Sequence, residues 1–354
     1  MDADWLDGEG RLTLPRFERV LAMGQRDPEV AALFAESVAR LGHGRVAELF
    51  DRFSVCTPEQ AQGLAGKTFL RTEVAVFSRT PEMEAAAREQ TRGPDLLGVR
   101  VVDTPDYVLV RRWVAPRICL VPGISLAGAY EALVHELVHA LRRDPFAAEL
   151  TADLSAPGLD EATFSIARVQ SPGDEVDAYV AASRARARLE GTNGVLLGPL
   201  QPLFDPSGAL RAPRDVLART ILAPAPTGLG YASGTMHAAL AQARRDEADM
   251  LDVRRKVVAA LVEGKQRERA VHAQNVVIHT QNLGVFEHNI GVARQRGDAA
   301  LEARTRAQLA EEQRLLASSK QGDQDAAAAG ARLAAELSSL DQRIAVLRSL
   351  AAGG

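Results

Sequence analysis

Two histidines and a glutamate stand close together in the segment YEALVHELVHALRR, residues 130–143. His135 and His139 are four residues apart, so in a helix both imidazoles project from one face, one turn apart. Both rings can then direct a nitrogen at a single ion, about 2.0–2.1 Å from each. Glu136 is rotated roughly 100° from His135. It borders such a metal without being forced to bind it, which is the position of a general base for a water that the metal activates.

The neighbours of these residues predict that the helix is buried. Leu133, Val134, Leu137, Val138 and Leu141 make the segment apolar over most of its surface. Two histidines and a glutamate buried without partners would be costly, and a bound metal removes that cost. The alternative is an ordinary buried helix that carries the same five residues by chance. The apolar setting favours the metal site.

A catalytic zinc site needs a third protein ligand and an open fourth position. Pro145 and Phe146 occupy the region where a third histidine would follow closely, so the remaining candidates are carboxylates. They are Glu149, Asp153, Asp174, Glu175 and Asp177.

The second strong helix is predicted in SPGDEVDAYVAASRARARLEG, residues 171–191, with Ser171 as its cap and Asp174 at capping-box spacing. Glu175 is the favoured ligand because it shares a stripe with Ala178, Tyr179 and Ala182, where small residues let two helices approach. Asp177 lies on the opposite face. The alternating arginines at 184, 186 and 188 fan around the helix and are expected on a solvated face.

The order HELVHA followed by EVDAYVAA resembles the zincin-fold metallopeptidases of the gluzincin type. The resemblance covers about residues 67–190. It implies that His135, His139 and Glu175 bind Zn²⁺ and that Glu136 is the catalytic base. It also implies hydrolysis of peptide bonds in a protein or peptide substrate.

The resemblance further implies a substrate-binding strand beside the active-site helix, which would hold an extended peptide through main-chain hydrogen bonds. The run RICLV is similar to that edge strand, and the alternative is an interior strand without a substrate role. Its residues are Arg117, Ile118, Cys119, Leu120 and Val121.

A hydrogen-bond donor must also stabilise the oxyanion that develops during hydrolysis. Tyr231, in the segment GLGYASG, is our candidate for this catalytic role, and Tyr130, Tyr179 and His237 are the alternatives.

The predicted fold class is α+β, mainly helical, with a small mixed sheet, a zincin-like active-site helix and a C-terminal helical hairpin or bundle. Short runs rich in β-branched residues between 67 and 122 predict the strands, with a turn at Pro105-Asp106. Three regions are expected: a helical segment at 1–65, a zincin-like domain at 66–234, and long helices at 235–354.

The C-terminal region carries a heptad seam and is predicted to form a coiled coil. Its apolar residues follow a 4-3-4-3 spacing at Leu333, Leu337, Leu340, Ile344 and Leu347. Residues 320–323 are expected to separate two helices, and the histidines at 272, 279 and 288 to be polar positions. Residues 297–350 could bind a helical partner or self-associate. The competing hypothesis for function is therefore a non-catalytic scaffold that acts through these helices.

Composition limits the classes of partner and compartment. The net charge of −4 gives no basic excess for nucleic acid, and no stretch approaches a membrane span. Two cysteines are too few for a disulfide framework, so a reducing compartment is expected, with Cys119 as a small buried residue. The N-terminus lacks an ordinary signal peptide, so the expected location is cytoplasmic, although a specialised secretion route would leave no such mark.

Overall fold

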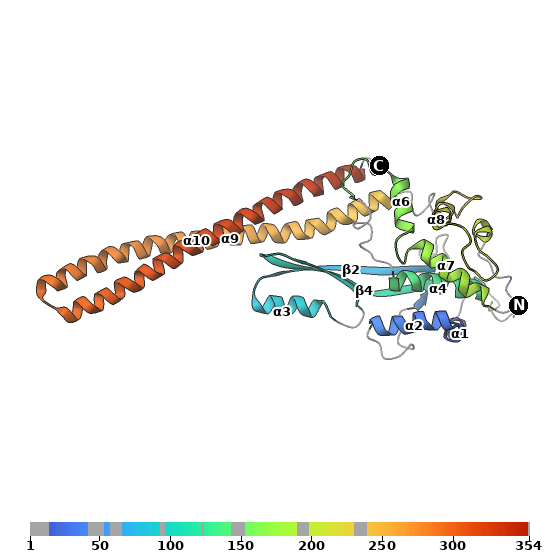
Figure 1. Cartoon of the computed structure of the whole chain (residues 1–354), viewed down its shortest axis with the longest axis horizontal. Helices are drawn as coiled ribbons and strands as arrows, with labels where there is room; N and C mark the ends of the chain where they lie inside the picture. The colour runs from blue at the N-terminus through green and yellow to red at the C-terminus, as the bar shows by residue number, and fades with distance from the viewer. Residues whose placement is uncertain are drawn as a thin grey trace. The chain divides into compact units, whose positions relative to one another are not determined.

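The computed structural model describes residues 14–41, 53–56, 66–92, 96–121, 124–142, 153–189, 198–229 and 239–352. The chain divides into two compact units, Met1–Glu247 with Val346–Gly354, and Ala248–Ala345. The regions 1–65 and 66–234, which we expected to be separate, belong to the same unit. The described chain is mainly helical, with one small sheet and a C-terminal pair of long helices, and so belongs to the α+β class (Figure 1).

The sheet is built around one long strand. β4 (Tyr107–Leu120) pairs antiparallel with β2 (Gly66–Ser78) on one side. Its other side pairs antiparallel with β3 (Leu96–Asp103) and, further along, parallel with the short β1 (Phe53–Val55). The described sheet is therefore mixed, as predicted.

The turn predicted at Pro105-Asp106 is confirmed and joins β3 to β4. Thr104 Oγ1 accepts hydrogen bonds from the backbone N–H groups of Asp106, at 3.3 Å, and Tyr107, at 3.0 Å. The Thr104 N–H donates to the Tyr107 carbonyl at 3.0 Å. A threonine hydroxyl and a proline with a fixed φ angle thus close the hairpin locally.

The expectation that Arg117–Val121 forms a free sheet edge is wrong. Arg117, Ile118, Cys119 and Leu120 pair with β2, and the last three of them also pair with β1. Val121 follows the end of the strand. Because strands occupy both sides of Ile118, Cys119 and Leu120, the backbone groups of these residues cannot accept an added peptide strand.

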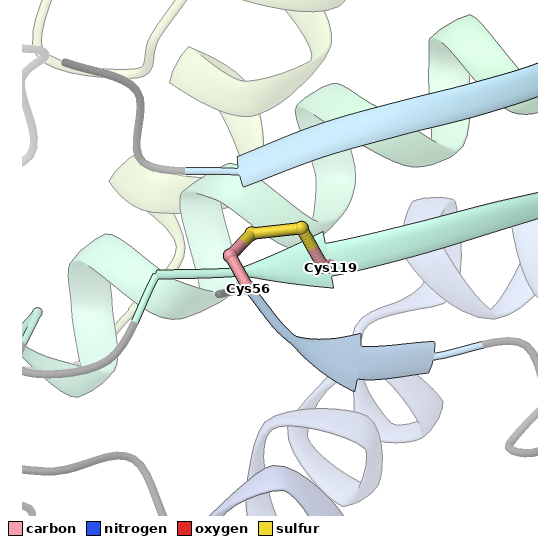
Figure 2. The surroundings of a disulfide bond; sticks show 2 residues. All are labelled: Cys56 and Cys119. Carbon is pink, nitrogen blue, oxygen red and sulfur yellow. A yellow bond between two sulfur atoms is a disulfide. The ribbon is translucent and has the colours of Figure 1, made fainter. Parts of the chain in front are cut away.

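Cys119 is buried, as expected, but a disulfide bond joins it to Cys56, so the expectation of reduced cysteines is wrong. Figure 2 shows the bond between the end of β4 and the residue that follows β1. The parallel pairing positions the two residues, because the Cys56 N–H donates to the Leu120 carbonyl at 2.9 Å and the two Cα atoms lie 4.8 Å apart. Disulfides persist in oxidising compartments, so the cysteines no longer support a reducing one.

Helices cover this sheet and supply the site. Residues of α4, α1 and α2 share one core cluster with Ile118 and Leu120 of β4, whereas Ala87 of α3 packs with Val108 and Val110. The helices before the C-terminal pair are α1 (Leu14–Arg26), α2 (Pro28–Leu41), α3 (Pro81–Gln90), α4 (Leu126–Arg142), α6 (Glu161–Val169), α7 (Glu175–Ala187), the 3₁₀ helix η3 (Gly198–Leu203) and α8 (Arg214–Leu222).

Asp27, between α1 and α2, ties these N-terminal helices to α4 and α7. One carboxylate oxygen accepts from the backbone N–H groups of Glu29 and Val30 at the start of α2. The other accepts from the Tyr130 hydroxyl of α4 at 3.0 Å and from Arg188, after α7, at 2.8 Å. Burial acts to raise the pKa of Asp27, but the hydrogen bonds from Arg188 and Tyr130 outweigh it and hold the pKa below its ordinary value.

The second unit consists of parts of α9 (Ala239–Arg296) and α10 (Ala299–Ala352), joined by a short turn. Within this unit the two helices run antiparallel (Figure 1). Ion pairs along them join Arg254 to Glu336 at 2.8 Å and Arg269 to Asp323 at 3.2 Å, and Nδ1 of His279 lies within hydrogen-bond distance of Glu312, at 2.6 Å. A helical hairpin, one of the two predicted arrangements, is therefore present.

The predicted heptad seam is confirmed by burial. Leu337 is half-buried, and the other four members are buried, namely Leu333, Leu340, Ile344 and Leu347. The helix break expected at residues 320–323 is wrong, because α10 continues through them. Gly322 lies against the ring of His272, where a Cβ would come within 2.4 Å of Cε1, so its lack of a side chain serves close packing. No helix in the described part of the chain is long and apolar enough to cross a membrane.

Replacing both cysteines, in Cys56→Ser with Cys119→Ser, is expected to lower the free energy of unfolding by about 2–4 kcal/mol. The reason is that the bond closes a loop with a sequence separation of 63 residues and so restricts the unfolded chain. Urea denaturation followed by circular dichroism measures the change. Reductant should bring the wild type to the stability of the double variant and leave the variant unaffected. Equal stability of the oxidised wild type and the variant would contradict the expectation.

Candidate metal centre

α4 presents His135 and His139 from a buried helix, as its apolar sequence predicted. Ser125 caps the helix, because its Oγ accepts from the Gly128 N–H at 3.1 Å. Both histidines and Glu136 are buried, and so are most of their neighbours on α4. The i and i+4 spacing places the two imidazoles together, with their Nε2 atoms 3.0 Å apart.

The start of α7 brings Glu175 to the same place. The helix begins at Glu175 and is capped by Asp174, so the predicted start at Ser171 is wrong. Ser171 instead donates its hydroxyl to the Ala167 carbonyl at the end of α6. Pro172 and Gly173 form the intervening turn, and Gly173 adopts a φ of 74°, a conformation that favours glycine. Glu175 is therefore the first residue of the helix, beside α4.

The two histidines and Glu175 form a compact group. The Nε2 atom of His135 lies 3.2 Å from Oε2 of Glu175, and the Nε2 atom of His139 lies 3.4 Å from Oε1. One ligand atom from each residue lies within 4.8 Å of the others, and such a group could hold a metal ion. In the part of the chain that the structure describes, this is the one such group of three or more potential ligands.

Hydrogen bonding fixes the orientation of His139. Its Nδ1 lies 3.0 Å from the Gly173 carbonyl. A carbonyl oxygen only accepts hydrogen bonds, so Nδ1 carries a proton, and in the neutral ring that binds a metal Nε2 then presents its lone pair toward His135 and Glu175. Partners of this kind hold a metal-binding histidine in the required tautomer.

The electrostatics of Glu175 also suit a metal ligand. Burial acts to raise the pKa of its carboxyl, but the charges and hydrogen bonds of His139 and His135 outweigh it and hold the pKa well below its ordinary value. Its Oε2 atom is buried, with Nε2 of His135 3.2 Å away. An ionised carboxylate is costly to bury unless positive charge lies beside it, and a cation bound by the three residues would supply that charge.

The other described carboxylate candidates form hydrogen bonds or ion pairs with other residues. Asp153 is exposed and accepts from the Ser155 hydroxyl and N–H. Asp174 caps α7, and Asp177 accepts from the Gly173 N–H and forms an ion pair with Arg214. Glu149 lies outside the described residues.

Among the described candidates for stabilising the oxyanion, Tyr179 is the one that contacts the group formed by His135, His139 and Glu175. Its ring packs edge-on against His135, with ring centroids 4.5 Å apart. Tyr130 instead donates to Asp27, and burial, followed by the charge of Asp27, raises the pKa of its hydroxyl. Tyr231 and His237 lie outside the described residues.

Two of the alternating arginines on α7, expected on a solvated face, form ion pairs near the site. Arg188 binds Asp27, and Arg186 Nη1 lies 3.2 Å from Oε2 of Glu131. Glu131 is one helical turn before His135, so this ion pair is a second link between α4 and α7. The sequence does contain a signal for Glu131. It precedes His135 by four residues, so a helix places the two side chains on the same face.

Comparisons with family models, with curated proteins and with solved structures find no match to this chain. The description of the site therefore rests on its own geometry.

Glu131 is expected to make the free energy of unfolding of the metal-free protein depend on pH. Burial raises the pKa of its carboxyl from 4.5 to about 6, although Arg186 and His135 act to lower it. Folding therefore favours the protonated form, and above pH 6 the ionised carboxylate costs the folded state about 2 kcal/mol. This cost is absent below pH 4.5, where the carboxyl is protonated in the folded and unfolded states alike.

Glu131→Gln removes the cost and is expected to stabilise the metal-free protein by up to about 2 kcal/mol near neutral pH. The gain should vanish as the pH falls toward 4.5, where the protonated wild type resembles the amide. Urea denaturation of both proteins in chelator, repeated across this range, measures it. A variant less stable than the wild type near neutral pH would mean that the ion pair with Arg186 outweighs burial.

Proposed function

We propose that this protein is a zinc-dependent peptidase that hydrolyses peptide bonds in a protein substrate. The observation that carries the proposal is the convergence of the buried His135 and His139 and the partly buried Glu175 from two helices into one group, with Glu136 next to the first histidine. The resemblance to gluzincin-type metallopeptidases rests on the same residues.

The separations within the group support Zn²⁺. Tetrahedral zinc holds nitrogen and oxygen ligands at about 2.0–2.1 Å, so neighbouring ligand atoms lie about 3.3 Å apart. The two Nε2 atoms lie 3.0 Å apart, and the two carboxylate oxygens of Glu175 lie 3.2 Å from His135 and 3.4 Å from His139, one oxygen to each ring. Two neutral imidazoles and one carboxylate form a donor set typical of catalytic zinc and leave a fourth position for substrate or water.

A zinc ion at this site would acidify a water molecule and polarise the substrate carbonyl. Glu136 would accept a proton from the water as the water oxygen bonds to the carbonyl carbon, and would deliver that proton to the amine nitrogen as the C–N bond breaks. The buried setting of Glu136 keeps competing water away from this transfer. The hydrogen bond between Nδ1 of His139 and the Gly173 carbonyl would keep the imidazole in place during the reaction.

We propose that β2, and not Arg117–Val121, binds the substrate peptide. In the described part of the chain β2 is an edge strand, because it pairs with β4 alone. α4 packs against both β2 and β4. An extended peptide added to the outer side of β2 would form main-chain hydrogen bonds irrespective of its side chains.

The scaffold hypothesis remains the second candidate. It is favoured by the division of the chain, since the hairpin forms a compact unit that contains none of the metal-binding candidates. The two hypotheses make opposite predictions for a change at Glu136.

Elemental mass spectrometry of the protein, purified without chelators, should find about one zinc ion per chain. His139→Ala and Glu175→Gln should each abolish zinc binding, because the site then keeps only two ligands. Asp153→Asn is the matched control, since it neutralises another candidate carboxylate that is exposed and bonded to Ser155, and it should retain the metal. Absence of zinc from the wild type after reconstitution would refute the proposed site.

Glu136→Gln should retain zinc and lower the rate of peptide hydrolysis by about two to four orders of magnitude, the usual contribution of a general base. The measurement is cleavage of a proteome-derived peptide library, followed by mass spectrometry, with zinc content measured on the same samples. Equal cleavage by the wild type and the zinc-loaded variant would exclude this mechanism. Absence of cleavage by either protein would favour the scaffold.

A further inference from the structure

The outer face of α9 in the helical hairpin carries a stripe of exposed apolar side chains. Val271, Ile278 and Val285 are 57%, 42% and 57% exposed, and they are spaced one heptad apart. The exposed Gln274 and Gln281 lie between them at intervals of three and four residues. These five residues, here called the α9 stripe, follow the 3-4-3-4 spacing of a helix-pairing seam.

This stripe is distinct from the seam within the hairpin. The seam of α10 is largely buried, and His279 and Asn282, which neighbour the α9 stripe in sequence, bind Glu312 of α10. The side of α9 that faces α10 is thus occupied. Self-association through the buried seam of α10 would have to open these contacts, whereas the α9 stripe is already exposed.

The stripe lies in a part of the helix without formal charge. From Ala270 to Phe286 the sequence contains no Asp, Glu, Lys or Arg, although charged residues make up 25% of the chain. Helices that lie on anionic membranes carry Lys and Arg on their polar face, and this segment has none. A strongly charged protein partner would likewise find no complementary charges. A second face that is also neutral meets no electrostatic penalty.

The order of side chains along the stripe is the same from either end. It is Val271, Gln274, Ile278, Gln281, Val285, that is, apolar and amide residues in alternation around a central isoleucine. A two-fold contact uses one patch on both molecules, so the patch must complement itself. With two copies antiparallel about Ile278, Val271 of one copy lies against Val285 of the other.

We propose that the α9 stripe is a dimerisation surface that binds a second copy of this chain, with the two-fold axis at Ile278. Two hairpins joined in this way form an antiparallel four-helix arrangement, which buries the exposed valines and isoleucine. The proposal does not depend on metal binding or on peptide hydrolysis.

Analytical ultracentrifugation of the full-length protein should detect a dimer. Ile278→Lys should weaken it by at least about a hundredfold, because two like charges would meet at the axis. Ile278→Glu should do the same. Val101→Lys is the matched control, since Val101 is a similarly exposed valine on β3, at 46%, outside the stripe, and this variant should remain dimeric. Circular dichroism checks that each variant is folded.

The decisive sample is a mixture of the Ile278→Lys and Ile278→Glu proteins. If the two copies meet at this residue, opposite charges restore a dimer that contains one molecule of each variant. A wild type that is monomeric at every concentration would overturn the proposal, whether or not it binds vesicles or another protein. So would a dimer that survives Ile278→Lys, or a mixture that stays monomeric.

Discussion

The contact between α4 and the beginning of α7 is the constraint on which the site depends. His135 and His139 are buried there and Glu175 is partly buried, and each of the three lies against a defined polar counterpart. Glu175 lies against both imidazoles, and the carbonyl of Gly173 fixes the tautomer of His139. Asp27 anchors both helices from outside the site. The small sheet, by comparison, serves as the surface on which α4 rests.

The parts of this arrangement that the sequence predicts are those set by short-range geometry. The i and i+4 spacing places His135 and His139 together in any helix, and the apolar residues around them predict burial. The stripe of small residues on the second helix favoured Glu175 over its neighbours, and the structure brings Glu175 to the histidines. The turn at Pro105 and the heptad seam of α10 are likewise local patterns.

The predictions that fail depend on which distant segments pair. Nothing in the run RICLV reveals that β1 covers its second side, because β1 is three residues long and lies far away in sequence. The same pairing brings Cys56 to Cys119, so counting cysteines alone gave the wrong redox state. Gly322 was expected to end a helix, but its lack of a side chain instead accommodates His272 of the opposite helix.

The disulfide also determines how the chain responds to a proteolytic cut. The segment between Cys56 and Cys119 contains β2, α3, β3 and nearly all of β4. A single cleavage within that segment leaves both fragments joined through sulfur, so the nicked molecule keeps its strands attached to the helix that carries the histidines. Such damage is invisible on a gel run without reductant and splits the chain in two once the bond is reduced. The disulfide thus gives covalent protection to the part of the fold that supports His135, His139 and Glu175.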